Sequence, residues 1–228
     1  MLELLRNTGP GWLPRKFGNS EPVRRSFAKE GEAGLTSAWH NTVLWVGTDP
    51  DIKGAVYTLP AGGHSEITVH MDLSPTREAE AITFLRHISQ LTQADFGFLH
   101  SLTAGDIDRG RASRSVAAVD TITQKDWHLI VTGHQLREEC LPDFYDINIF
   151  GRPYIDMFGH DRLLTTPAWK IEEISPDLVW VQTIASRAAG GIAENEIERR
   201  RLEAKHHLNC GAFFSLEQDG RYRVPTFA

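Results

Sequence analysis

The stretch DFYDINIFGRPYIDMFGHDRLLTTP, residues 143–167, decides the architecture expected for this chain. Two Phe-Gly steps end at Gly151 and Gly159 and bracket an aromatic segment. A glycine after an aromatic residue often marks a positive φ or a close backbone approach, and Pro153 suits the first turn of a helix. The pattern therefore predicts a turn-helix-turn with a short helix between the two glycines. No nucleophile, phosphate loop or metal quartet accompanies it.

A sheet followed by a helix is expected before this stretch. Residues 67–73 alternate apolar and polar side chains, which is typical of a strand with one buried face. Two shorter β-prone runs, 43–46 and 55–59, end at turn formers and predict a meander. Ser74 and Pro75 then suit the N-cap and first position of a helix. The apolar stripe expected on that helix comprises Ala81, Phe84, Leu85, Ile88 and Leu91.

More strands and a long polar helix are expected further along. Residues 96–99 and 127–131 have strand character. The runs 169–174 and 178–184 flank Ser-Pro-Asp and predict a hairpin. Residues 193–208 predict a helix held by pairs such as Glu196 with Arg200 and Glu198 with Arg201. Its inward side chains are expected to be Ile197, Ala204 and Leu208.

The predicted fold class is α+β, because six to eight strands and three or four helices follow one another without strict βαβ alternation. We expect a single domain over residues 23–228, built on a mostly antiparallel sheet. Residues 1–22 are expected to form an N-terminal extension. The polar stretch 15–34, which begins with turn formers, suggests a loosely attached segment that leads into a short helix near residues 23–29.

Composition favours an ordinary globular protein. Of 228 residues, 41% are hydrophobic and 24% are charged. Residues 1–16 lack the continuous apolar run of a signal peptide or membrane span, so a cytoplasmic protein without membrane contact is expected. Cys140 and Cys210 are too few for a disulfide framework or a zinc site, which suggests buried or incidental thiols.

The acidic residues gather in one region. Residues 138–177 hold nine acidic and three basic side chains, and the difference (9 − 3 = 6) equals the excess in the whole chain's net charge of −6. Such a field repels nucleic acid and attracts basic partners, although a solvated acidic face is the alternative. With two tyrosines as possible anchors, the predicted partner-binding residues are Glu138, Glu139, Asp143, Tyr145, Asp146 and Tyr154.

Catalytic chemistry finds little support. His70 and Asp72 share a strand face and could in principle hold a divalent metal, but no second ligand cluster completes a site. His128, His134 and Glu138 do not match a helical H-E-x-x-H motif. There is no G-x-S-x-G elbow and no G-x-x-x-x-G-K-[ST] loop. We therefore expect no enzyme, no metal and no cofactor.

Other candidate chemistry points the same way. Cys140 follows Glu139, and an acidic neighbour raises a thiol's pKa and weakens it as a nucleophile. The arginines at 109–114 lack aromatic partners, and those at 199–201 alternate with glutamates nearby. Solvated faces are therefore favoured over nucleic-acid binding.

Several short motifs follow one another in a characteristic order along the chain. They are Trp45 with Asp49-Pro50, the strand Ile67 to Asp72, Asp95-Phe96-Gly97-Phe98, Leu141-Pro142-Asp143-Phe144-Tyr145, Phe150-Gly151-Arg152-Pro153-Tyr154 and Met157-Phe158-Gly159. Their order resembles the immunity protein fifty-two type of bacterial immunity domains, over about residues 23–214, although Asp146 stands where that family is expected to carry an aromatic residue.

This resemblance implies an α+β protein without catalysis that is made beside a toxin and neutralises it by stoichiometric binding in the producing cell. It assigns no toxin-binding residue. Two alternatives stay open: a metal-dependent hydrolase that uses the His70 and Asp72 face, and an interaction module with no toxin partner.

Overall fold

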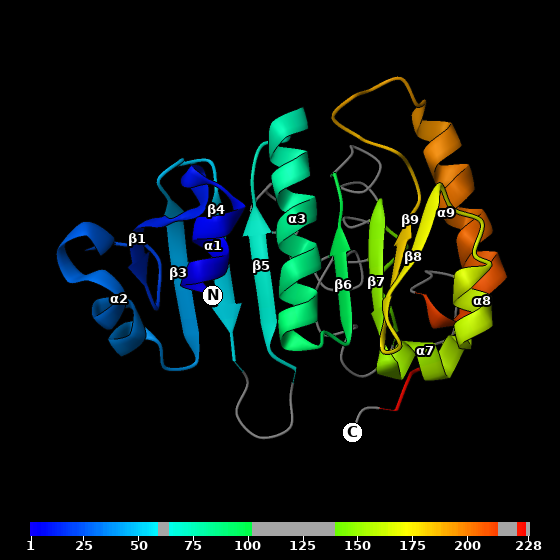
Figure 1. Cartoon of the computed structure of the whole chain (residues 1–228), viewed down its shortest axis with the longest axis horizontal. Coiled ribbons are helices and arrows are strands. Elements are labelled where there is room, and N and C mark those ends of the chain that lie inside the picture. Colours follow the sequence, from blue (N-terminus) through cyan, green and yellow to red (C-terminus); the bar gives the residue numbers. More distant parts are fainter. Residues whose placement is uncertain (59–63, 102–139, 214–222, 227–228) are drawn as a thin grey trace, which may run out of the picture. The chain divides into compact units, whose positions relative to one another are not determined.

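The computed structural model describes residues 1–58, 64–101, 140–213 and 223–226. The chain divides into two compact units, Met1–Ile88 and Ser89–Ala228. Each unit holds one antiparallel sheet, and the described ranges contain six α-helices and nine strands (Figure 1). The predicted α+β class with antiparallel pairing is therefore confirmed, with short helices raising the count above three or four. None of the helices in these ranges is long and apolar enough to cross a membrane.

The first unit contains a five-stranded sheet with the order β2-β1-β3-β4-β5. The consecutive pairs β3 with β4 and β4 with β5 form the predicted meander. The strands are β1 Pro14–Gly18, β2 Arg25–Ser26, β3 Thr42–Gly47, β4 Lys53–Tyr57 and β5 Glu66–His70. The helices are α1 Leu2–Thr8, the 3-10 helix η1 Pro10–Trp12, α2 Phe27–Ala38 and α3 Pro75–Thr92.

The N-terminal residues are not loosely attached, which corrects the expectation for 1–22. β1 lies inside the sheet between β2 and β3, and Trp12 and Phe17 are fully buried. The indole of Trp12 stacks on Phe84 with ring centroids 4.9 Å apart, and its Nε1 donates to Glu80 Oε2 at 2.8 Å. Widely spaced apolar anchors thus fix a segment whose average composition is polar. The domain boundary proposed at residue 23 stays a prediction.

Helix α3 begins as the sequence predicts. The backbone N–H of Arg77 donates to Ser74 Oγ at 3.2 Å, which is an N-terminal cap, and Pro75 opens the helix. Ala81, Phe84 and Ile88 are buried, whereas Leu91 is 66% exposed. Ser89 is buried instead, so the buried face turns away from Leu91 in the last turns.

The second unit contains a four-stranded sheet with the order β6-β7-β9-β8, all antiparallel. The hairpin predicted around Pro176 is present as β8 and β9. The predicted strand at 127–131 lies outside the described residues. The strands are β6 Phe96–Leu99, β7 Ile147–Gly151, β8 Lys170–Ser175 and β9 Leu178–Gln182, and the helices are α7 Arg152–Phe158, α8 His160–Leu164, α9 Glu194–Leu208 and the 3-10 helix η2 Cys210–Ala212.

The turn-helix-turn expected from residues 143–167 is confirmed. Gly151 caps the start of α7, and Gly159 ends it with φ +91°. The N–H of Gly151 donates to Asp95 O at 2.8 Å, which brings the end of β7 against the segment before β6. Tyr154 and Phe158 pack into the aromatic core of the unit. The glycines therefore serve a close approach in one case and a positive φ in the other.

The two central strands of this sheet are buried on both faces. Every residue of β7 and β9 is buried, including the polar Asn148 and Gln182. Asn148 exchanges two hydrogen bonds with the backbone of Tyr145, since its Oδ1 accepts from Tyr145 N–H at 2.9 Å and its Nδ2 donates to Tyr145 O at 2.9 Å. Gln182 Nε2 donates to Ile184 O at 2.9 Å. These polar groups are satisfied inside an apolar core.

Helix α9 carries the predicted pattern and one unexpected residue. Ile197, Ala204 and Leu208 are buried, and Arg200 Nε lies 2.7 Å from Glu196 Oε1. Arg201 pairs with a glutamate as expected but is itself only 1% exposed. Its guanidinium contacts Phe144 and Asp143.

Candidate functional site

Three of the four predicted partner-binding residues that the structure describes are buried. Tyr145, Asp146 and Tyr154 are 2%, 4% and 2% exposed, so their proposed role as surface contacts is corrected. The tyrosine rings fill the core, because Tyr145 stacks on Phe98 with centroids 4.1 Å apart and Tyr154 packs among the aromatic residues near Gly151. Glu138 and Glu139 lie outside the described residues, as do His128, His134 and the arginines at 109–114.

Asp143 is an internal ion-pair partner. Its Oδ2 lies 2.5 Å from an Arg201 Nη, and its Oδ1 accepts from Lys205 Nζ at 2.8 Å. Burial raises the pKa of the Asp143 carboxyl, but the charges of Arg201 and Lys205 and the N–H of Phe144 outweigh it, so the pKa is lowered overall. The carboxylate therefore stabilises the attachment of α9 rather than a partner.

Asp146 lies in a buried polar cluster at one end of the sheet. Its Oδ2 accepts from Ser101 N–H at 3.0 Å and lies 3.4 Å from His100 Nδ1 and 3.7 Å from Arg187 Nε. Burial raises the pKa of Asp146, whereas the hydrogen bond and charge of His100, the N–H of Ser101 and the charge of Arg187 lower it overall. These contacts hold the Asp146 carboxylate inside the protein.

These two buried carboxylates predict a loss of stability in acid. A depressed folded-state pKa stabilises the fold above the carboxyl's ordinary pKa, near 4, and this contribution disappears as the pH falls through the folded value. We expect the denaturation midpoint to fall below about pH 4. In Asp143→Asn the midpoint should be lower at pH 7 and should change less between pH 5 and pH 3. Asp161→Asn, at a fully exposed carboxylate, is the matched control.

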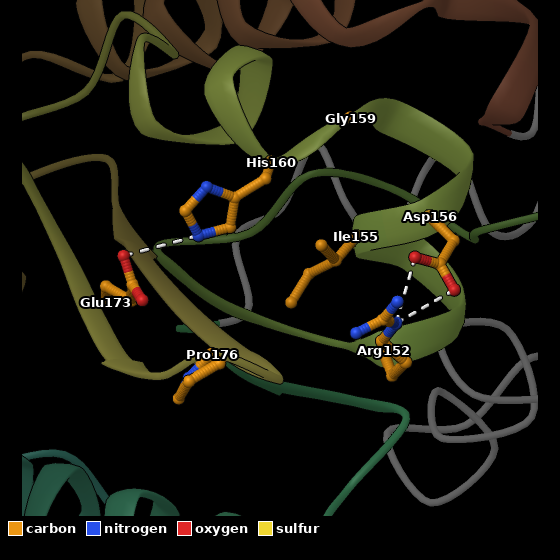
Figure 2. A pocket seen from close by; sticks show the side chains of 7 residues that line it. All are labelled: Arg152, Ile155, Asp156, Gly159, His160, Glu173 and Pro176. Atoms are coloured by element: carbon orange, nitrogen blue, oxygen red, sulfur yellow. Dashed lines mark hydrogen bonds and ion pairs between the residues drawn. The ribbon is translucent and has the colours of Figure 1, made fainter.

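A hollow bordered by exposed polar groups lies between α7, the start of α8 and the β8–β9 hairpin (Figure 2). We call it the α7–β8 hollow. Gly159 turns the chain from α7 into α8, which places His160 above the hollow, while β8 supplies Glu173 from the opposite wall. The volume is about 460 Å³, and the lining residues are Arg152, Ile155, Asp156, Gly159, His160, Glu173 and Pro176.

Arg152 and His160 each pair with carboxylates at the hollow. Arg152 Nε lies 2.9 Å from Asp156 Oδ1, and an Arg152 Nη lies 3.1 Å from Asp177 Oδ1. His160 Nε2 lies 3.3 Å from Glu173 Oε2. In the view of Figure 2 the Arg152–Asp156 pair and the His160–Glu173 pair stand on opposite sides, and Ile155 points between them. Ile155 is 5% exposed and gives the hollow an apolar floor.

The hollow and its paired groups carry a negative excess. Two carboxylates line the hollow and two more pair with its lining residues, so that four carboxylates and one guanidinium leave three net negative charges (4 − 1 = 3) with His160 counted as neutral. All five side chains are well exposed, from 41% for Glu173 to full exposure for Asp161. The carboxylates are Asp156, Asp161, Glu173 and Asp177, and the guanidinium is that of Arg152.

An exposed tryptophan precedes the same edge strand. Trp169 is 54% exposed and is followed directly by β8, which forms the edge of the four-stranded sheet. Lys170, Glu172 and Glu173 make this edge charged, with Lys170 Nζ 2.8 Å from Glu172 Oε2. The sequence places Trp169 in an apolar run, which does not reveal its exposure.

The metal site considered for His70 and Asp72 is incomplete in the described residues. β5 ends at His70, so Asp72 lies beyond the strand and the alternation that joined the two side chains does not extend to it. Within the ranges that the structure describes, no group of three or more His, Cys, Asp or Glu side chains is arranged to hold a metal ion.

The thiol of Cys210 lies beside the imidazole of His206. Its Sγ lies 3.2 Å from His206 Nδ1, whereas Cys140 is buried. Cys140 and Cys210 do not form a disulfide bond with each other.

Comparisons with known proteins give no match from which a function could be assigned. No protein-family model matches the chain, and no curated protein and no solved structure is found to be similar to it.

Proposed function

We propose that this chain is an immunity-type protein that neutralises a basic toxin in the cytoplasm by stoichiometric binding. The observation that carries the proposal is the exposed surface of the α7–β8 hollow, which together with its paired groups has three net negative charges. This surface includes part of the edge strand β8, which directly follows the exposed Trp169. Tyr145, Asp146 and Tyr154 are buried, so we assign the partner surface to exposed residues of the same acidic region.

Charge and aromatic exposure have separate roles in such a surface. Exposed carboxylates steer a basic protein and raise its association rate. Trp169 offers a large side chain of the type that is enriched among interface residues with the greatest effect on affinity. An acidic surface with one exposed tryptophan therefore suits a protein partner of opposite charge.

The edge strand also disfavours a second copy of this chain as the partner. If two copies of β8 paired antiparallel about the midpoint between Glu172 and Glu173, Glu172 of one copy would lie opposite Glu173 of the other. A shift of one residue would place Glu172 opposite Glu172, or Glu173 opposite Glu173. Like charges directly opposite each other destabilise strand pairs. A basic partner removes this repulsion.

The hollow favours protein recognition over small-molecule chemistry. Small-molecule sites are usually enclosed, mostly apolar and able to bury most of the ligand surface. The α7–β8 hollow is open and is bordered by ion pairs whose side chains are well exposed. A protein side chain, held from outside by its own backbone, suits such a site better.

Co-expression tests this function. Cells that produce the protein encoded by the adjacent reading frame should grow only when this chain is also produced, and the two proteins should form a 1:1 complex. Trp169→Ala should weaken that complex about tenfold or more, because exposed tryptophans at interfaces typically contribute that much. Leu202→Ala is a matched control, since Leu202 is 50% exposed on α9.

Two outcomes would count against the proposal. Growth that does not depend on this chain would remove the toxin partner and favour an interaction module of another kind. An equal loss of affinity in both variants would remove Trp169 and its sheet edge from the interface.

A further inference from the structure

We infer that the α7–β8 hollow receives a single basic side chain, a lysine or an arginine, projected from the partner's surface. The inference rests on the proposed function, since the side chain comes from a protein partner. It adds the chemical identity of the group that enters and the residues that receive it.

The charge pattern favours a cation over an anion. Arg152 is shared between Asp156 and Asp177 at 2.9 and 3.1 Å, which compensates part of two carboxylates. Glu173 faces only His160 within the lining, and an imidazole carries a positive charge only when it is protonated. An entering ammonium or guanidinium group would supply the missing positive charge.

The shape of the hollow suits a long side chain with an apolar stem. Ile155 lies at the floor and Pro176 at the hairpin end, so both present carbon atoms to the entering group. Lysine and arginine pack their methylene stems against such surfaces while the charged head reaches carboxylates. A volume of about 460 Å³ is ample for one such side chain.

The guanidinium of Arg152 competes with the entering cation for the same carboxylates. Two substitutions are therefore expected to change the affinity in opposite directions. Glu173→Gln removes the least compensated carboxylate and should weaken binding of a basic side chain. Arg152→Gln removes the competing guanidinium and should strengthen it. Glu203→Gln changes the net charge equally on α9, outside the hollow, and should have little effect.

The test uses three blocked tripeptides, Gly-X-Gly, in which X is lysine, arginine or norleucine. They are titrated into the ¹⁵N-labelled full chain. The lysine or arginine peptide should shift the amide signals of Gly159, His160 and Glu173, whereas norleucine, which has the stem without the charge, should not. Glu173→Gln should weaken this binding about three- to fivefold, as expected for one exposed ion pair.

Each other result decides against the inference. No shifts at these amides, equal shifts with norleucine, or equal weakening in Glu173→Gln and Glu203→Gln would overturn it. If the adjacent-frame protein binds and protects cells while Glu173→Gln changes nothing, the hollow is not the receiving site and the proposed function stands. If the basic peptides bind as expected but that protein neither binds nor protects, the proposed function fails and the chemistry of the hollow stands.

Discussion

Replacement of Gly151 by alanine is expected to lower the free energy of unfolding by about 3 kcal/mol, at the upper end of the cost of overpacking. A Cβ at this position would overlap the carbonyl oxygen of Ala94 and would lie 2.9 Å from Asp95 Cα. Both obstacles are backbone atoms, so no side-chain rotation relieves them. The loss should appear as a lower midpoint in chemical denaturation followed by circular dichroism.

Gly159 provides the matched comparison. Its φ is +91° and nothing lies within 4 Å of a Cβ built there, so Gly159→Ala meets conformational strain without a clash. An alanine in this sparsely populated conformation costs about 1–3 kcal/mol. Equal midpoints for Gly151→Ala and the parent protein would show that β7 does not approach the segment before β6 as described.

Loss of Arg201 is the second change with a large expected effect. Its guanidinium is 1% exposed, donates to Phe144 O at 2.5 Å and contacts the carboxylates of Asp143 and Glu198. Removing one member of a buried ion pair leaves the other charge uncompensated, which typically costs 3–5 kcal/mol. Arg201→Ala should lower the unfolding free energy by about that amount, measured by urea titration at pH 7.

Two further variants separate the buried pair from general charge effects. Arg199→Ala removes an arginine from the same helix whose side chain is 55% exposed, and it should leave the midpoint nearly unchanged. In Arg201→Ala/Asp143→Asn the two losses should not add, because both remove the same interaction. Additive losses would mean that the pair is not coupled.

Local signals explain which parts of the fold were predictable. The α7 turn-helix-turn, the β8–β9 hairpin and the inward face of α9 depend on residues close in sequence, such as Gly159, Pro176 and Ile197. The attachment of the N-terminal residues depends on Trp12 reaching Phe84 and Glu80, nearly seventy residues away. No local pattern announces such a contact.

The candidate site was predictable in region but not in residues. A count of acidic residues in 138–177 cannot separate carboxylates that fold inward from those that remain exposed. Asp143 and Asp146 turn inward because Arg201, Lys205 and His100 meet them from distant segments. Asp161 and Asp177 stay outside on a helix end and a hairpin turn.

The burial of β7 and β9 on both faces has a consequence for strand alignment. A strand that is buried on both faces has no polar side to turn toward water, so a slip by one residue would cost little in hydrophobic burial. Such a slip would, however, separate Thr183, directly after β9, from the residues directly before β7, because Thr183 N–H donates to Asp146 O at 2.8 Å and Thr183 Oγ1 donates to Tyr145 O at 2.8 Å. Thr183 is fully buried, and each such loss costs about 1–3 kcal/mol. One buried threonine thus selects one register for a sheet centre whose apolar residues would accept several.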